Sequence, residues 1–275
     1  MPPARTVSGC VDSATNRLPR GSSDIVAPVA VPTADTLDAA LRAQADPERA
    51  QREKQYLKSE LEHYGVPVPT MHQIAARQSR ALDRQGLLSV ATQLWDEPGA
   101  SPVHDRRFLA ADMLAARSEL LAPSDAQVLE RMLRQARTWA IVDTLAPRVV
   151  GPLADRYSDD MTPVLDAWAR DDDYWLRRSA LLAHLIPLRD GRGDWARFTR
   201  YADLMISDRE FFVAKALGWV LRDTGRRRPG LVVEWVRPRV ADMSAISVKE
   251  ALKPLPPEVQ QELRSRRTDV ASRPR

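Results

Sequence analysis

Two short stretches of the chain place an aromatic ring and a charged group on the same helical face. In "TWAIVDTLAPRVVG", Trp139 and Asp143 are four positions apart, and in "DDDYWLRRSALLAHL", Trp175 and Arg178 are three positions apart. At about 100° per residue, each pair falls on one side of a helix. A carboxylate can stabilise positive charge or activate water, and an arginine can hold a phosphate.

A third stretch, "REFFVAKALGWVLRDTG", carries two cations around a tryptophan inside an apolar run. Lys215, Trp219 and Arg222 share one face of the expected helix. The opposite face is apolar and supplies the core, through Val213, Leu217, Val220 and Leu221. The charged face is either an exposed tryptophan packed under two long side chains or a binding face for an anion with flat rings, such as nucleic acid.

Each of these residues also has a purely structural interpretation. Trp175 is more typical of a core residue, and Arg178 could pair with one of the acidic residues 171–173. Asp143 could equally be a salt-bridge partner. The joint pattern of aromatic rings, cations and one carboxylate on three successive helices is harder to explain by packing alone.

Composition favours a globular protein without disulfide bonds. The chain has 275 residues, 44% hydrophobic and 28% charged, and a single cysteine, Cys10, which fits a reducing compartment. No apolar run approaches the roughly 18–20 residues that cross a bilayer, and no secretory signal is apparent. The net charge is +4, and the basic residues are mostly arginine. Arginine enrichment suits phosphate contacts but would also follow from a GC-rich genome.

Helical periodicity extends over most of the chain, and strand alternation is absent. Breaks are expected at Asp46-Pro47, at Gly65 to Pro69 and at Asp96 to Pro102. Pro47 suits a first helical turn, and Gly65 suits the C-terminal end of the helix that begins there.

The middle of the chain repeats. Strong helices are expected to start near Asp105, Thr138, Asp173 and Asp208, roughly 35 residues apart, with a second helix between each pair. This spacing predicts an all-α solenoid of helical pairs with a concave surface. We expect a disordered extension over residues 1–34, the repeat domain over 35–263 and a basic disordered tail over 264–275.

Five stretches, taken in order, resemble one family: "QYLKSELEHYGVPVP", "TWAIVDTLAPRVVG", "WLRRSALL", "EFFVAKALGWVLRD" and "SVKEALK". The chain is similar over residues 36–260 to the alkylpurine DNA glycosylases built from HEAT-like repeats. The resemblance implies a solenoid that holds duplex DNA and removes N3- and N7-alkylated purines, such as 3-methyladenine and 7-methylguanine, without base flipping.

The resemblance also implies roles for individual residues. Asp143 looks like the catalytic carboxylate, with Trp139 and Trp219 beside the deoxyribose of the lesion. Arg178 looks like a cation on the DNA backbone, and Tyr56 like another residue of the cleft. Lys215 and Arg222 are expected to face DNA because they share the face of Trp219.

A single aspartate is sufficient for this chemistry because the leaving purine is cationic and needs little protonation. Positive charge develops on the sugar, where a carboxylate stabilises it. We therefore expect a monofunctional enzyme that acts on alkylated duplex DNA. We also expect a monomer that is located in the cytoplasm and interacts with no membrane. No metal-ligand or nucleotide-binding spacing is apparent, so no metal and no cofactor are expected. The alternatives are a non-catalytic DNA-binding relative and a protein-interaction scaffold.

Overall fold

The computed structural model describes residues 31–96 and 101–271, with side chains as far as Thr268. Across these residues we find helices and one isolated β-bridge, between Glu62 and Val103, and no strand. The predicted all-α class is therefore confirmed. The α-helices are α1 Ala34–Arg42, α2 Pro47–Leu57, α3 Val68–Gln78, α4 Arg84–Trp95, α5 His104–Ala116, α6 Ala126–Gln135, α7 Trp139–Leu145, α8 Gly151–Arg156, α9 Ser158–Trp168, α10 Tyr174–Leu182, α11 Leu185–Arg189, α12 Trp195–Leu204, α13 Phe211–Gly225, α14 Pro229–Val236, α15 Ala245–Leu252 and α16 Pro257–Ala271.

The four predicted starts of strong helices match α5, α7, α10 and α13. Local capping explains two of them. The Thr138 hydroxyl accepts the Ala140 N–H at 3.2 Å, and the Asp173 carboxylate accepts the Trp175 N–H at 2.8 Å. Such caps satisfy backbone donors that have no partner in the first turn of a helix, so they fix where α7 and α10 begin.

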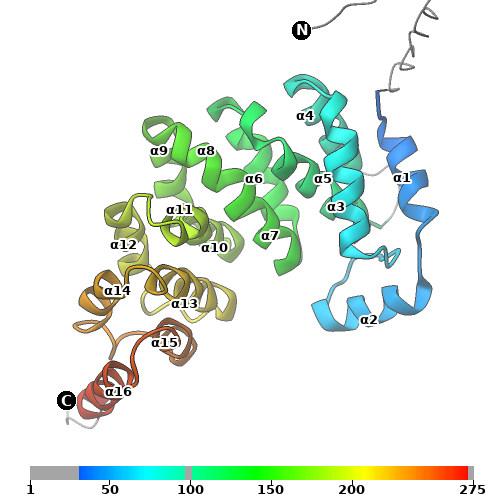
Figure 1. Cartoon of the computed structure of the whole chain (residues 1–275). Helices are drawn as coiled ribbons and strands as arrows, with labels where there is room; N and C mark the ends of the chain where they lie inside the picture. The colour runs from blue at the N-terminus through cyan, green and yellow to red at the C-terminus, as the bar shows by residue number, and fades with distance from the viewer. Residues whose placement is uncertain (1–30, 97–100, 272–275) are drawn as a thin grey trace, which may run out of the picture. The chain divides into compact units, whose positions relative to one another are not determined.

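One set of helices packs in chain order, each on the next: α5, α7, α10, α13 and α15, which we call the helix series. Helices α4, α6, α9, α12 and α14 pack against members of this series and form a second layer (Figure 1). Both layers contribute to one continuous apolar core. Helix packing therefore follows chain order through the middle of the chain.

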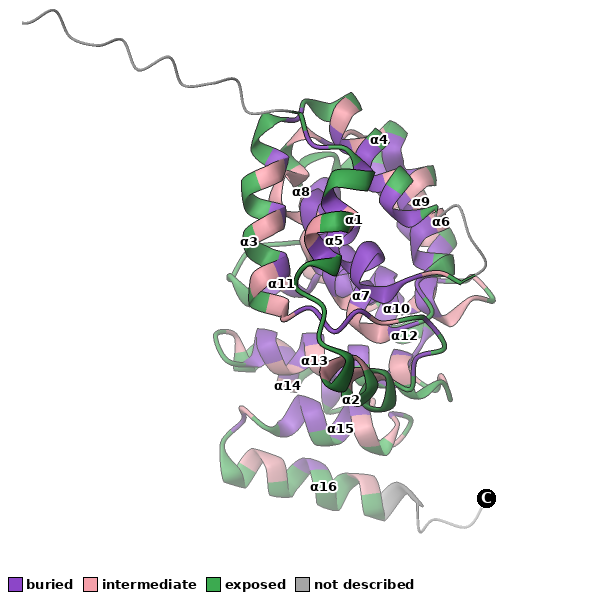
Figure 2. Cartoon of the chain, turned by 90° about the vertical axis from the view of Figure 1, so that its right-hand side faces the viewer, coloured by how far each residue is buried: buried purple, intermediate pink, exposed green. Residues whose placement is uncertain are grey.

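Helix α13 has the two faces that its sequence predicts. Its apolar face is fully buried, through Val213, Leu217, Val220 and Leu221. Lys215 is exposed, and Trp219 and Arg222 are half-buried. Figure 2 shows buried residues concentrated in the helix series, whereas α2 has no buried residue.

The helix that begins at Pro47 is shorter than predicted. It ends at Leu57, where Lys58 adopts a left-handed conformation with φ of 49°, and the predicted end at Gly65 is wrong. Gly65 has φ of 80° and serves a different purpose. A Cβ at this position would lie 2.2 Å from the carbonyl oxygen of Asp46, so only glycine allows this close approach.

The predicted domain ends differ in one respect from the structure. Helix α16 continues to Ala271, past the boundary expected at residue 263. Arg267, assigned to the basic tail, donates a hydrogen bond to the Val240 carbonyl at 3.1 Å, which attaches this helix to the chain before α15. The predicted extension, with Cys10, lies outside the described residues except for residues 31–34. None of the described helices has the length and apolarity needed to cross a membrane.

Candidate functional site

Asp143 lies in the second turn of α7 and is bound by Arg178 of α10. The Arg178 guanidinium donates to both carboxylate oxygens, with distances of 2.9 and 2.6 Å to Oδ1 and 2.8 Å to Oδ2. Its remaining Nη1 donates to the backbone carbonyl of Phe212 at the start of α13. The Arg178 side chain is only 2% exposed, so this buried guanidinium fixes the orientation of the Asp143 carboxylate.

This pairing resolves two structural alternatives left open by the sequence. Arg178 pairs with Asp143 and not with the acidic residues that precede α10. The neighbouring Arg177 contacts this acidic segment instead, because its Nη1 donates to the Asp171 carbonyl at 2.7 Å. Its Nε donates to the carboxylate of Asp208 at 2.8 Å. Trp175 is buried, which agrees with the expectation that it belongs to the core.

The environment of Asp143 opposes its ionisation in one respect and favours it in two. Burial raises the pKa of the Asp143 carboxyl above its usual range, while the charge of Arg178 and then that of Lys215 act in the opposite direction. The carboxylate is 16% exposed, so it can still be reached from the pocket above it. A fixed, partly desolvated carboxylate of this kind is well suited to stabilise a cation.

The six predicted residues on α7, α10 and α13 line one pocket of about 300 Å³. They are Trp139, Asp143, Arg178, Lys215, Trp219 and Arg222. Phe212 and Glu250 complete the pocket wall and were not predicted. Three helices that are adjacent in the helix series, together with α15, therefore bring together residues that lie more than a hundred positions apart in the chain.

The cations of this pocket are not equivalent. Lys215 is exposed, with its ammonium 5.7 Å from the centre of the Phe211 ring. Arg222 instead forms ion pairs with Asp223, at 3.2 Å, and with Glu250 of α15. Its charge is largely neutralised within the protein, so Lys215 is the better positioned of the two to meet an anion.

Trp219 is oriented by a partner that sequence analysis missed. Its indole Nε1 donates to Asp223 Oδ2 at 3.2 Å, one helical turn further along α13. Asp223 is itself buried and bound by Arg222. The i, i+4 spacing of Trp219 and Asp223 was visible in the sequence and could have indicated this contact. Glu250 lay in the quoted "SVKEALK" stretch, but nothing there indicated a partner on α13.

Tyr56 lies beside this pocket, on α2. Its ring meets that of Trp139 edge-on, with centroids 5.8 Å apart. Both residues line a second pocket of about 510 Å³, together with Arg49 and Arg52. Tyr56 is 73% exposed, and Trp139 forms a wall common to the two pockets. Tyr56 therefore lies next to the pocket that contains Asp143, although it does not line that pocket.

The stretch after Asp143 departs from the single helix expected over "TWAIVDTLAPRVVG". A π-helical segment, Ala146–Val150, separates α7 from α8. Pro147 lies within it and has no N–H to donate, which removes one bond of a regular α-helical ladder. The wider turn carries Arg148, which binds Asp112 at 2.6 Å.

The chain matches a protein-family model over most of its length. The family model described as "DNA alkylation repair enzyme" matches residues 37–255. No curated protein is significantly similar to the chain.

Two solved structures share the fold. One is described as a predicted DNA alkylation repair enzyme from Enterococcus faecalis, with 19% identity and a TM-score of 0.68. The other is a protein of Streptococcus mutans UA159, with 16% identity and a TM-score of 0.53. Each comparison covers 78% of this chain and 98% of the other. At these identities, the likeness supports the helical architecture only.

Proposed function

Because the chain belongs to the DNA alkylation repair enzyme family, we propose that it is a monofunctional DNA glycosylase. Its substrates are duplex DNA lesions in which a purine is alkylated at N3 or N7, such as 3-methyladenine and 7-methylguanine. The observation that carries this proposal is the Asp143 carboxylate, fixed by Arg178 in a pocket walled by Trp139 and Trp219.

The chemistry follows from the charge of the lesion. An N3- or N7-alkylated purine is cationic, so cleavage of its glycosidic bond releases a neutral base and needs no general acid. Positive charge develops on the deoxyribose, and Asp143 stabilises it and orients or deprotonates the attacking water. The product is an abasic site, because this mechanism uses no amine nucleophile.

The residues around Asp143 support the same reaction. Each of the three guanidinium nitrogens of Arg178 donates a hydrogen bond inside the protein, so we assign Arg178 to holding Asp143. The phosphate contact implied by the family resemblance stays a prediction. The faces of Trp139 and Trp219 favour a cationic sugar and exclude bulk water. We assign Lys215, which is exposed, to contact with a backbone phosphate, and Tyr56, whose ring meets that of Trp139, to an extension of the aromatic wall.

The decisive experiment measures release of free 3-methyladenine and 7-methylguanine from methylated duplex DNA by the purified full-length protein. We expect release by the wild type. Asp143→Asn should lower the single-turnover rate constant by about 10²-fold or more, because it removes the charge that stabilises the transition state. DNA binding should be retained.

Asp166→Asn is the matched control, because Asp166 is a solvent-accessible aspartate paired with Arg200 outside the pocket. This variant should release both bases at the wild-type rate. Folded wild-type protein that binds DNA but releases neither base would refute the glycosylase and support the non-catalytic binder. Undiminished release by Asp143→Asn would refute the role of Asp143.

A further inference from the structure

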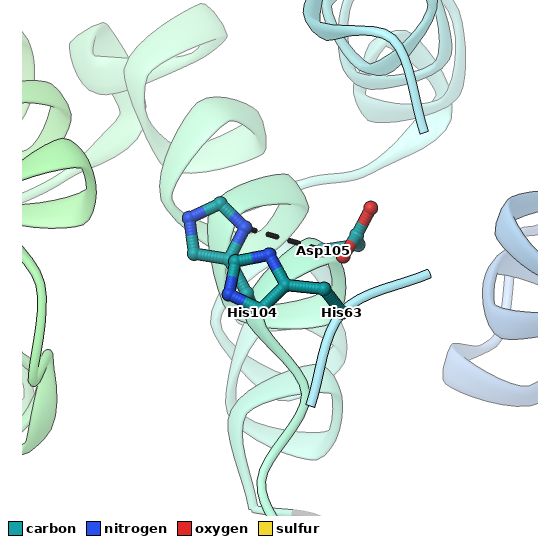
Figure 3. A group of neighbouring side chains, drawn as sticks. All are labelled: His63, His104 and Asp105. Atoms are coloured by element: carbon teal, nitrogen blue, oxygen red, sulfur yellow. Dashed lines mark ion pairs between the residues drawn. The ribbon is translucent and has the colours of Figure 1, made fainter. Parts of the chain in front are cut away.

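A second group of side chains lies outside the pocket that contains Asp143. His63 comes from the irregular chain between α2 and α3, and His104 and Asp105 begin α5. The two imidazole rings stack with centroids 4.4 Å apart and planes 10° apart (Figure 3). One potential ligand atom from each of the three residues lies within 4.8 Å of the others.

The ring nitrogens of this group have only distant charged neighbours: His104 Nδ1 lies 4.0 Å from Asp105 Oδ2, the ion pair drawn as a dashed line in Figure 3. Both ring nitrogens of His63 and both of His104 are buried without a hydrogen bond among the described residues. The side chains are 1% and 5% exposed, so water does not compensate them from the surface. A buried polar group left unpaired is destabilising, and here four such atoms lie together. A neutral imidazole has one N–H and one lone pair, so a metal ion would satisfy one nitrogen of each ring.

The carboxylate of the group is already oriented. Asp105 Oδ2 accepts the Tyr64 N–H at 2.9 Å, and Oδ1 accepts the Val66 N–H at 2.8 Å. Each oxygen keeps a further lone pair, because a carboxylate has about four acceptor positions. Backbone donors that fix a carboxylate in this way are typical of the surroundings of metal ligands.

A fourth group lies next to the cluster. Glu53 Oε2 of α2 is also buried without a hydrogen-bond partner, 3.9 Å from His63 Nδ1. It is placed to accept the ring N–H that His63 would keep if its other nitrogen bound a ligand. This is the usual way in which the ring of a metal-binding histidine is oriented.

We propose that His63, His104 and Asp105 bind one divalent transition-metal ion of the zinc class. Two imidazoles and one carboxylate are a ligand set that zinc and its neighbours accept, with one position left for water. The stacked rings are parallel, so binding requires them to turn their nitrogens toward a common point. His63 also lines a surface pocket of about 420 Å³, so the cluster lies close to the protein surface.

Such an ion would connect parts of the chain that are otherwise weakly joined. Helix α2 has no buried residue, yet it carries Tyr56, whose ring meets that of Trp139. The ion would join the segment after α2 to the start of α5, and Glu53 would attach α2 itself. The metal site would thereby fix the position of Tyr56, whatever reaction the neighbouring pocket performs.

The test uses the full-length protein with Cys10→Ser, freed of metal by chelator, so that no thiol can bind the ion. Zn²⁺ is titrated by calorimetry and Co²⁺ by visible absorption, and the melting temperature is followed with each. We expect one ion per chain, a cobalt d–d band and a rise in melting temperature. His63→Gln should weaken binding at least tenfold, and Glu53→Gln by about 10- to 100-fold.

His72→Gln is the matched control, because His72 is half-exposed and paired with Asp112 outside the cluster. It should bind both ions as the parent does. Circular dichroism of the metal-free forms establishes that each variant is folded. Absence of stoichiometric binding by the parent protein, or equal binding by folded His63→Gln, would overturn the metal site. Excision activity plays no part in either readout.

Discussion

At the scale of single residues, the state of Asp143 decides what the pocket can do. Only the ionised form stabilises a developing cation, and burial raises the pKa of this carboxyl while Arg178 limits the rise. A carboxyl with a raised pKa takes up its proton at a higher pH than an ordinary aspartate, whose pKa is about 3.9. The proposed activity should therefore be lost at less acidic pH than an unperturbed aspartate would allow.

The pH profile provides the first test at this scale. We expect the single-turnover rate constant for base release to fall as the pH is lowered through the raised pKa of Asp143, with the midpoint of the decline above the pKa of an ordinary aspartate. Spontaneous depurination is measured without protein and subtracted. A rate constant that stays level down to about pH 4 would contradict the raised pKa.

Replacing Arg178 provides the second test. Arg178→Gln removes the cation that lowers the pKa of Asp143, so the acid side of the profile should move to higher pH. Arg178→Lys keeps the charge and should move it less, although it loses the two-pronged hydrogen bonding. An unshifted profile for folded Arg178→Gln would show that the pair does not control Asp143. A reduced salt dependence of DNA binding would instead indicate that Arg178 reaches phosphate.

At the scale of helices, α13 and α15 approach closely at Gly218. A Cβ at this position would lie 2.7 Å from the Cβ of Glu250 and 2.9 Å from the Ser247 carbonyl oxygen. Ser247 also donates its hydroxyl to the Ala214 carbonyl at 2.7 Å, which binds the two helices together. The packing that brings Glu250 to Arg222 thus depends on the absence of a side chain at Gly218.

Gly218→Ala should therefore lower the free energy of unfolding by about 1–3 kcal/mol, because backbone and a short Cβ cannot move aside easily. Urea denaturation followed by circular dichroism measures this change. Gly230→Ala in α14 is the control, since a Cβ there meets nothing within 4 Å, and it should be neutral or slightly stabilising. Equal stability of the Gly218 variant and wild type would mean that α15 shifts freely.

The sequence predicts helices well where local signals suffice and fails where distant contacts decide. Thr138 and Asp173 cap helices that begin where expected, because capping involves only neighbours in sequence. Gly65 looked like a helix end, but its conformation serves the approach to Asp46, which no local pattern reveals. The helix at Arg267 was missed for a related reason, since its partners are carbonyls before α15.

In the candidate site, too, local patterns could be predicted from the sequence and contacts between distant residues could not. The faces of α13 follow from its periodicity, so Lys215, Trp219 and Arg222 could be found from the sequence. The pairing of Arg178 with Asp143 could not, because the sequence offered nearer acidic partners and only packing of α7 against α10 excludes them. The stacking of His63 on His104 likewise depends on irregular chain between α2 and α3.

At the scale of the whole molecule, composition overstates the positive charge available to DNA. The chain has 41 basic residues, but many arginines are bound to carboxylates elsewhere in the structure. Arg134 binds Asp171 at 2.6 Å, and Arg239 binds Asp203 at 2.6 Å. A paired arginine releases fewer counterions on binding DNA than an unpaired one would. Exposed cations beside the pocket, such as Lys215, should thus contribute more than their number suggests.

This argument predicts how salt affects DNA binding. Each phosphate contact contributes about 0.9 to the slope of log affinity against log salt concentration for duplex DNA. Lys215→Ala should therefore weaken binding and reduce the slope by roughly that amount, as measured by fluorescence anisotropy with a duplex at several salt concentrations. Arg84→Ala is the matched control, because Arg84 is bonded to Asp125 and Ser124 and lines neither of the two pockets. Its slope should equal that of the wild type. An unchanged slope for Lys215→Ala would place the phosphates elsewhere on the protein, and the pocket would then need another means of approach to the lesion.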